Sequence, residues 1–598
     1  MFTENNTYNG GTTIFNGVTL QLGNGGTTGS IVGNIPDAGT VAFDRSDPIT
    51  FAGTISGLGT LSQIGSGTLT LTASNLYRGG TFISGNGTVS VATNANLGIT
   101  TGVIGGITLQ GGELLTTGAA STFTTARGIV LNTAVGPDIL AAVTTTTATY
   151  TGVVSGPGAL IVGDGTHTGT AVFTRANGYL GGTTINGATL QLGNGVTTGS
   201  ILGNVTDNGN FAFAPGISNA ATFSGAVSGS GTLRQIGPGT LTLTNPTNSY
   251  SGGTFVLGGT LSVDTDAELG LTTGGITLQS GELLTTADGF TTARTVGISS
   301  TGTLAATSGT TATYSGLISG TSGALTVGDG THTGTIVFTG NNTYSGGTII
   351  AGGVLSVGGD ANLGATSGGI TLHSGELLTT ADGFTTGRTV DVSSTGILAT
   401  TTGTTATYSG LISDTGALVI GDGTHTGTVV FTGNNTYSGE TTINVGTLEI
   451  GSGGSMGSIV GNVIDNASLV VNRSGSVTLP GAISGPGTLS QIGAGTLILT
   501  GTSTYAGATT VSAGTLEVDG GLGNTAVNVQ NGAVLSGQGT IAGGVTIQNG
   551  GHLAPGPGAQ TLGVGNLSLN SGSILDYVLS TPGVIVPGLI AWSTLAAT

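Results

Sequence analysis

One phrase of 37 residues recurs along this chain and limits the folds that it can adopt. The phrase occupies residues 482–518 (AISGPGTLSQIGAGTLILTGTSTYAGATTVSAGTLEV). Its central part stands again at residues 55–72 (ISGLGTLSQIGSGTLTLT) and 227–244 (VSGSGTLRQIGPGTLTLT). Near-copies of this kind are typical of repeat architectures, in which each unit stacks on its neighbours. The first expectation is therefore a repeat protein.

Apolar and polar residues alternate within the phrase. Leu497 and Leu499 alternate with Thr496, Ile498 and Thr500, and glycines stand on both sides of the run. This pattern predicts a strand of about five residues between tight bends. Glycine supplies 120 of the 598 residues, as a chain with frequent sharp corners requires, because glycine enters the positive-φ region at little steric cost. No stretch shows helical periodicity with a cap, so essentially no helix is expected.

A second marker, a tyrosine followed by Gly-Gly-Thr or a variant, allows the cassettes to be counted. Successive markers lie 68 to 102 residues apart. A propeller requires regular blades of about 40 to 45 residues. A parallel β-solenoid with coils of roughly 20 residues tolerates variable cassettes, because whole coils can be inserted. An all-β parallel β-solenoid is therefore predicted. The marker tyrosines are Tyr8, Tyr77, Tyr179, Tyr250, Tyr344, Tyr437 and Tyr505.

Three regions are expected along the chain. Residues 1–517 form the repetitive β-helix of about seven cassettes, and residues 518–579 continue it with shorter strands. Residues 580–598 resemble nothing earlier and hold the single tryptophan, Trp592. A frameshift or truncation is one interpretation of this tail.

Composition limits the partners that the chain can bind and the cellular compartment that it suits. The formal charge is −18, and all eight basic residues are scattered arginines, so no basic surface for nucleic acid can be assembled. Cysteine is absent, which suits a chain that crosses an oxidising compartment unfolded. Residues 1–5 lack the features of a signal peptide, and no apolar run is long enough for a membrane helix.

The combined motif resembles the autotransporter-associated β-strand repeat of passenger domains. The resemblance rests on G-x-G-T-L-x-x-x-G-x-G-T-L-T-L, then N-x-Y-x-G-x-T, then G-T-L, as at residues 59–81 and 487–516. Residues 535–556 also resemble the C-terminal passenger segment of that family. The resemblance implies a right-handed parallel β-helix that crosses the outer membrane through a C-terminal β-barrel and whose folding outside assists its passage.

The chain departs from the family pattern in three respects. Glutamine stands at Gln63, Gln235 and Gln491, where such repeats often carry lysine. A signal peptide and a membrane barrel are both missing from the sequence, since only 19 residues follow Leu579. Two interpretations remain open, a truncated passenger and a free-standing secreted solenoid with a separate barrel.

The phrase GDGTHTGT is the most site-like feature. An aspartate and a histidine three residues apart could bind a metal or transfer protons. The favoured interpretation is a structural D-G turn followed by an outward histidine on a strand, because the phrase recurs with its cassette. Calcium binding is disfavoured for lack of tandem nonapeptides. The phrase places its residues at Asp164/His167, Asp329/His332 and Asp422/His425.

Other candidate groups also recur with the cassettes. Glu113, Glu282 and Glu376 stand in GELLTT phrases and are expected at solvated corners. The marker tyrosines are expected to be packing residues, with glycan stacking as the alternative. Parallel β-helices also host polysaccharide-degrading enzymes, but these require clustered carboxylates, whereas the 34 charged residues of this chain are dispersed. Ice binding would require uniform T-x-T ladders, which are interrupted here.

The sequence therefore predicts a secreted or surface-displayed autotransporter-like passenger with a structural or adhesive role. No catalytic residue, metal ligand or cofactor is assigned. The expected partners are host or environmental glycans or proteins, or other cells, and a separate or missing outer-membrane barrel. A β-helix polysaccharide-degrading enzyme is the first alternative, and a truncated fragment without independent function is the second.

Overall fold

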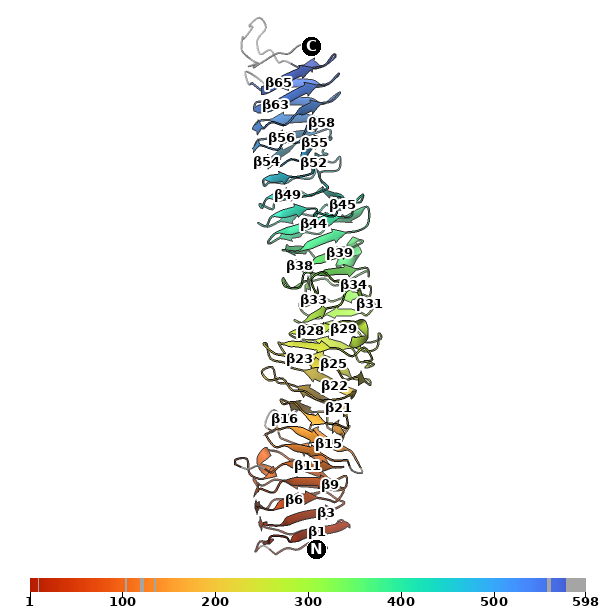
Figure 1. Cartoon of the computed structure of the whole chain (residues 1–598), viewed down its shortest axis with the longest axis vertical. Helices are drawn as coiled ribbons and strands as arrows, with labels where there is room; N and C mark the ends of the chain where they lie inside the picture. The colour runs from red at the N-terminus through yellow and green to blue at the C-terminus, as the bar shows by residue number, and fades with distance from the viewer. Residues whose placement is uncertain (9, 103–104, 119–122, 134–135, 557–560, 577–598) are drawn as a thin grey trace. The chain divides into compact units, whose positions relative to one another are not determined.

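The computed structural model describes residues 1–8, 10–102, 105–118, 123–133, 136–556 and 561–576. The chain divides into two compact units, unit 1 (Met1–Phe290) and unit 2 (Thr291–Thr598). Short parallel strands stack coil on coil within each unit, so the predicted all-β parallel β-solenoid is confirmed (Figure 1). The tail predicted at residues 580–598 lies outside the described residues.

Each coil of unit 1 folds back on its predecessor along three sides. One coil contains β6 (Thr60–Gln63), β7 (Thr68–Leu71) and β8 (Leu76–Tyr77), and the next begins with β9 (Thr81–Ser84) and β10 (Thr88–Val91). The β6–β9 and β7–β10 pairings are parallel and shift the register by 20 residues. This shift matches the predicted coil length. The next coil is longer, because β11 (Ile107–Gln110) pairs with β9 at a shift of 26 residues.

Aliphatic side chains form continuous columns inside the coils. In unit 1 the column passes through β7, β10, β12 (Glu113–Thr116) and β15 (Asp138–Ala142) and consists of Leu69, Val89, Leu114 and Leu140. All four side chains are fully buried. Burying each contributes about 1.5–3 kcal/mol relative to exposure. The column is therefore a main source of the stability of the unit.

Unit 2 shows the same packing, beginning in the phrase at residues 482–518. Four strands stack in register: β56 (Thr496–Leu499), β59 (Thr515–Val518), β62 (Val534–Gly537) and β64 (His552–Pro555). Leu497, Leu516, Leu535 and Leu553 align inside. Along β56 buried residues alternate with partly exposed ones, as the alternation predicted.

A side chain two residues before each marker tyrosine, from Tyr77 onward, joins successive coils. Its oxygen accepts a hydrogen bond of 2.8–3.0 Å from a backbone N–H of the preceding coil. In unit 2 the Asn342 amide also donates to the Asn362 carbonyl of the next coil, at 2.6 Å. We call this arrangement the coil latch. Its pairs are Ile55–Asn75, Val154–Asn177, Val227–Asn248, Ile318–Asn342, Ile412–Asn435 and Ile483–Ser503.

From Tyr77 onward, the marker tyrosine completes the latch from inside the coil. Each of the seven tyrosine hydroxyls lies 2.5–2.7 Å from the hydroxyl of a threonine four residues later. The glycine two residues after Tyr505, Gly507, lies so close to the coil below that a Cβ would stand 2.0 Å from the Gly487 carbonyl oxygen. Any larger residue at this position would therefore push the coils apart.

A buried glutamine holds the corner where the family often has lysine. Gln63 donates from Nε2 to the carbonyls of Gly65 and Gly67, both at 2.8 Å. Gln235 and Gln491 make the equivalent pairs. A neutral amide satisfies these carbonyls without the desolvation cost of a buried ammonium group.

Buried arginines hold the longer loops. In unit 2, Arg388 donates to the Asp360 carboxylate at 2.7 Å and to the carbonyls of Gly364 and Gly368 at 2.7 and 2.9 Å. In unit 1, Arg127 binds the Asn94 side chain and the Gly105 carbonyl. These arginines are 3% exposed, so they are structural residues and add nothing to a basic surface.

Helix is confined, among the described residues, to three 3-10 turns of four residues each. They are η1 (Asn94–Leu97), η2 (Asp266–Leu269) and η3 (Asp360–Leu363). The prediction of essentially no helix is confirmed. In the described part of the chain, no helix has the length and apolar character needed to cross a bilayer.

Replacing Asn342 by alanine should destabilise unit 2. The change leaves the buried Ile318 N–H and the Asn362 carbonyl without their partners. Each unsatisfied buried group costs about 1–3 kcal/mol. We expect a lower urea midpoint by far-UV circular dichroism for Asn342→Ala. Asn341→Ala, at the exposed neighbouring residue, is the matched control and should unfold like the wild type. Equal midpoints for the two variants would contradict the latch.

Candidate functional site

Six of the seven marker tyrosines are core residues. Tyr77, Tyr179, Tyr250, Tyr344, Tyr437 and Tyr505 are at most 1% exposed. Burial raises the pKa of the Tyr344 and Tyr505 hydroxyls to about 12. The packing interpretation is confirmed for these six, and they offer no ring face to a glycan. Tyr8 differs, because it is 39% exposed.

Each GDGTH phrase folds into a compact loop in which the aspartate and histidine side chains are hydrogen-bonded to each other. In unit 1, Asp164 Oδ1 accepts the N–H groups of Thr166 and His167, at 2.8 and 2.6 Å. Its Oδ2 lies 2.6 Å from His167 Nδ1. The histidine lies in the loop before β19 (Thr170–Phe173), so the prediction that it sits on a strand is wrong.

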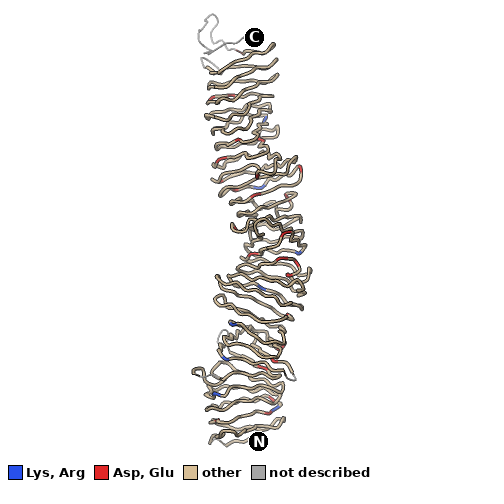
Figure 2. The backbone as a smooth tube through the Cα atoms, in the orientation of Figure 1, with Lys and Arg blue, Asp and Glu red and all other residues tan. Residues whose placement is uncertain are grey.

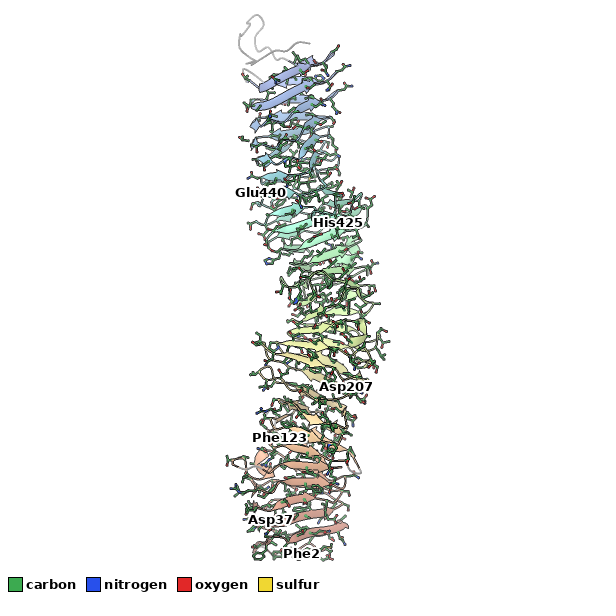
Figure 3. The ribbon with its side chains drawn as sticks, in the orientation of Figure 1. Phe2, Asp37, Phe123, Asp207, His425 and Glu440 are labelled. Carbon is green, nitrogen blue, oxygen red and sulfur yellow. The ribbon has the colours of Figure 1, made fainter. Side chains whose placement is uncertain are left out.

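Unit 2 contains two copies of this loop. In the first, His332 Nδ1 lies 2.7 Å from Asp329 Oδ2. In the second, His425 Nδ1 lies 2.6 Å from Asp422 Oδ2, and Asp422 Oδ1 accepts the N–H groups of Thr424 and His425. Figure 3 labels His425 within unit 2. The D-G turn was predicted correctly, but the tight aspartate–histidine pair was not.

Within unit 1 and within unit 2, a glutamate from another coil of the same unit joins one of these pairs. Glu113 lies with Asp164 and His167 in unit 1, and Glu376 lies with Asp422 and His425 in unit 2. In each group one potential ligand atom of each side chain lies within 4.8 Å of the others. We call the two groups the unit 1 triad and the unit 2 triad.

The triads form because coils stack with a fixed register. Glu113 opens β12, and the next two positions of its ladder are Ile139 on β15 and Ile161 on β18 (Leu160–Val162). Asp164 follows Ile161 by three residues. In unit 2 the ladder runs from Glu376 through Ile397 to Val419, and Asp422 again follows by three residues.

The glutamates do not lie at solvated corners, so that prediction is wrong. Glu113 opens β12 and is half-buried, and Glu376 opens β41 (Glu376–Thr379) and is 8% exposed. Glu282 opens β30 (Glu282–Thr285), also half-buried, and accepts a hydrogen bond from Thr260 at 3.0 Å. The alternation of the strands places all three side chains against neighbouring coils.

In the unit 2 triad, the pKa values of the two carboxyl groups shift in opposite directions. Burial, followed by the nearby charge of Asp422, raises the pKa of Glu376 to about 7. Burial acts in the same direction on Asp422, but the backbone and imidazole hydrogen bonds from His425 outweigh it and lower that pKa. Each triad can therefore share a proton between two carboxyl groups or hold a cation.

The triads are poorly suited to cleaving a glycosidic bond. Such cleavage requires both carboxyl groups to face the sugar across a cleft. Glu376 Oε1 and Glu113 Oε1 are shielded from solvent and accept no hydrogen bond. A sugar ring cannot reach an oxygen that is enclosed between coils.

Buried aspartates at the corners of the short cassettes were missed in the sequence. Asp37, Asp207 and Asp465 are at most 1% exposed, and one oxygen of each accepts a backbone N–H two residues ahead. Figure 3 labels Asp37 and Asp207 within unit 1. The repeated phrases NIPDAG, NVTDNG and NVIDNA carry the signal that could have identified them. Burial raises the pKa of Asp207 and Asp465 to about 6.

A shallow groove lies on the outer face of unit 1. Its volume is about 330 Å³, and it crosses β21 (Thr183–Leu192), β22 (Val205–Phe213) and the end of β25 (Thr232–Gln235). The guanidinium of Arg234 lies over the Phe255 ring, with Cζ 4.8 Å from the centroid. We call this groove the Arg234 groove. Its lining residues are Thr189, Gln191, Asn210, Ala212, Arg234 and Ile236.

Charged residues are dispersed within each unit, as Figure 2 shows. The side chains of Arg45, Arg127, Arg388 and Arg473 are turned toward backbone carbonyls and neighbouring polar groups. No basic stripe forms among the described arginines.

The passenger-associated-transport-repeat family model matches seven segments, which together cover about a third of the chain. Each segment contains one marker tyrosine. The resemblance stated from the motifs is confirmed. The segments are residues 1–22, 61–91, 166–192, 233–263, 333–357, 424–450 and 485–518.

A curated relative shares part of the chain. The Adhesin BmaC autotransporter of Brucella suis biovar 1 (strain 1330) is 35% identical over 173 residues, which is 29% of this chain. The match covers 5% of that relative, so this chain spans a small part of its length. No solved structure matches the chain.

Asp465 should make the stability of unit 2 depend on pH. Its pKa is about 6 in the folded chain, against an ordinary value of 3.8. Between these values the folded state holds a proton that the unfolded state releases, so the free energy of unfolding falls as the pH rises through this window. Glu376, whose pKa is also raised, acts in the same direction, so Asp465→Asn should lessen but not abolish that fall between about pH 4 and about pH 7, measured by urea denaturation. Asp414→Asn, at an exposed residue, should retain it; identical pH profiles for both variants would contradict the assignment.

Proposed function

We propose, from the premise that this chain carries passenger-associated transport repeats, that it is the passenger part of an autotransporter and acts as an adhesin. It would work outside the cell, either displayed at the bacterial surface or released from it. The observation that carries the proposal is that every matched repeat contains a marker tyrosine, within coils that turn aliphatic residues inward. The partial match to an adhesin autotransporter supports the adhesive role.

The outer face of the coils has the chemistry of a weak polar contact surface. Thr40 and Thr60 stand side by side on adjacent coils with their hydroxyls 3.0 Å apart. Thr232 donates to Asn210 across another pair of coils in unit 1, at 2.9 Å. Hydroxyl and amide groups both donate and accept hydrogen bonds, as the hydroxyls of glycans and the backbone of proteins require. Repetition of such contacts from coil to coil would raise avidity without strong single sites.

The Arg234 groove is the first place where we expect such a partner to bind. It combines the hydroxyl of Thr189, the amides of Gln191 and Asn210, and the guanidinium of Arg234 around the small side chain of Ala212. The Phe255 ring beneath the guanidinium holds its plane in place. The groove therefore offers preorganised donors to a glycan or a protein surface.

The repeats would also support export. Each latch joins a new coil to the coil before it, so folding can proceed from an existing coil without distant contacts. The low content of charged residues, 6%, and the absence of cysteine leave few groups that resist passage through a membrane pore. Progressive latching outside the membrane would then oppose backward movement of the chain.

Beads coated with the full-length chain should adhere to cultured epithelial cells more than beads coated with serum albumin. Arg234→Ala should lower bead retention by at least about twofold, since a single polar contact contributes roughly 0.5–1.5 kcal/mol and is multiplied by valency. Arg175→Ala, which removes an exposed arginine from the same unit, is the matched control. Wild-type adhesion no greater than that of albumin would overturn the proposed function, and equal loss in both variants would exclude the groove.

Surface display should depend on the latch. In a strain that exports the chain, Asn342→Ala should reach the surface in smaller amounts than Asn341→Ala, because the coil containing Ile318 is held less firmly. Quantitative antibody labelling of intact cells, normalised to total protein, measures the difference. Equal display of the two variants would separate the latch from export.

A further inference from the structure

The unit 2 triad brings a buried glutamate oxygen without a hydrogen-bond partner close to a second carboxylate. Glu376 is 8% exposed, and its Oε1 is buried and accepts no hydrogen bond. The carboxylate of Asp422 lies beside it, within the 4.8 Å that joins the ligand atoms of the triad. Two neighbouring carboxylates with little water around them repel each other unless a proton or a cation lies between them.

Glu376 lacks a hydrogen-bond donor that the equivalent glutamate of the unit 1 triad has. In unit 1, Thr88 precedes Glu113 in the ladder and donates its hydroxyl to Glu113 Oε2 at 2.8 Å. In unit 2 the equivalent position is Val354, which has no hydroxyl to donate. The side chain of Glu376 is therefore aimed into the triad without this partner.

The donor set identifies the kind of cation. His425 Nδ1, an Asp422 oxygen and a Glu376 oxygen converge as one nitrogen and two oxygen ligands. Calcium and magnesium prefer sites made of oxygen alone, whereas imidazole together with carboxylate suits zinc and neighbouring transition metals. Three protein ligands leave a fourth tetrahedral position for water.

The loop of the triad is built to hold its ligands. Two backbone N–H groups, from Thr424 and His425, fix Asp422 Oδ1 at 2.8 and 2.7 Å and turn Oδ2 toward the imidazole. The His425 side chain is 29% exposed and the Asp422 side chain 16%, so an ion can enter from solvent. Binding of an ion through His425 Nδ1 requires the tautomer that carries its proton on Nε2, because a ring nitrogen that donates a proton has no lone pair for the ion.

We propose that Glu376, Asp422 and His425 bind a divalent transition-metal ion of the zinc class. The site is independent of the proposed adhesive function, because its ligands lie apart from the Arg234 groove in sequence and bind a different class of ligand. A bound ion ties a loop to a strand two positions away in the ladder and thereby reinforces the stacking of coils.

Zinc chloride titration of the full-length chain, without an affinity tag and stripped of metal with a chelator, tests the proposal. Isothermal titration calorimetry at about pH 7.5 measures the stoichiometry and the affinity of binding. Glu376→Gln and His425→Ala should each lose one equivalent of bound zinc, or bind that equivalent at least about tenfold more weakly. The melting temperature of the wild type should rise with zinc by more than that of either variant.

His552→Ala is the matched control. His552 Nδ1 lies 2.7 Å from Asp576 Oδ2, but this pair belongs to no group of three ligands among the described residues. The control should bind as much zinc as the wild type. Equal melting temperatures without metal show that the variants are folded, and Glu376→Gln is nearly isosteric.

Three results would overturn the proposal. If the wild type binds no zinc, or if both variants keep the wild-type stoichiometry, Glu376 and Asp422 share a proton instead. If calcium chloride binds at the triad more tightly than zinc chloride, the ion belongs to the oxygen-preferring class.

Discussion

The structure depends on satisfying the backbone of each coil at its corners, where strand pairing stops. Along the sides, parallel ladders pair the N–H and C=O groups, but every corner leaves groups that face the neighbouring coil. A buried group left without a partner costs about as much as a lost hydrogen bond. The latch asparagines supply the missing partner: the Asn342 oxygen receives Ile318 N–H, and its amide reaches Asn362. The aliphatic columns stabilise the stack, and the latches fix its register.

Much of this fold could be predicted from the sequence because its signals are local. The alternation around Leu497 and Leu499 gave the strand and its buried face, and the recurring tyrosines gave the cassettes. The role of the latch could not be predicted, since Asn342 and Ile318 are 24 residues apart and meet only when the coil length is known. The corner aspartates were missed although the repeated phrases NIPDAG, NVTDNG and NVIDNA carry their signal. The neutral Gln63 appeared as a departure from the family pattern, and the structure shows it bound to two glycine carbonyls.

The triads were not predicted from the sequence, because their glutamate lies far along the chain from the aspartate and the histidine. Asp422 and His425 were recognised together because they are three residues apart, and their repetition favoured a structural interpretation. Glu376 was considered separately, although two steps along its ladder lead to Val419, three residues before Asp422. Repetition of a cassette repeats its chemistry as well as its fold, so recurrence alone does not separate a structural turn from a repeated binding site. The same logic applies to the outer face, where repeated weak contacts act together.

Residue-resolved amide hydrogen exchange on the wild-type chain measures whether the latches protect the corners of the coils. The N–H groups of Ile55, Val154, Val227, Ile318, Ile412 and Ile483 each face a latch side chain. If the latches hold, these amides exchange as slowly as those at the centres of the neighbouring ladder strands. Exchange at the rate of exposed loop amides would contradict this expectation, because the corners would then be open to water and the latches would hold nothing.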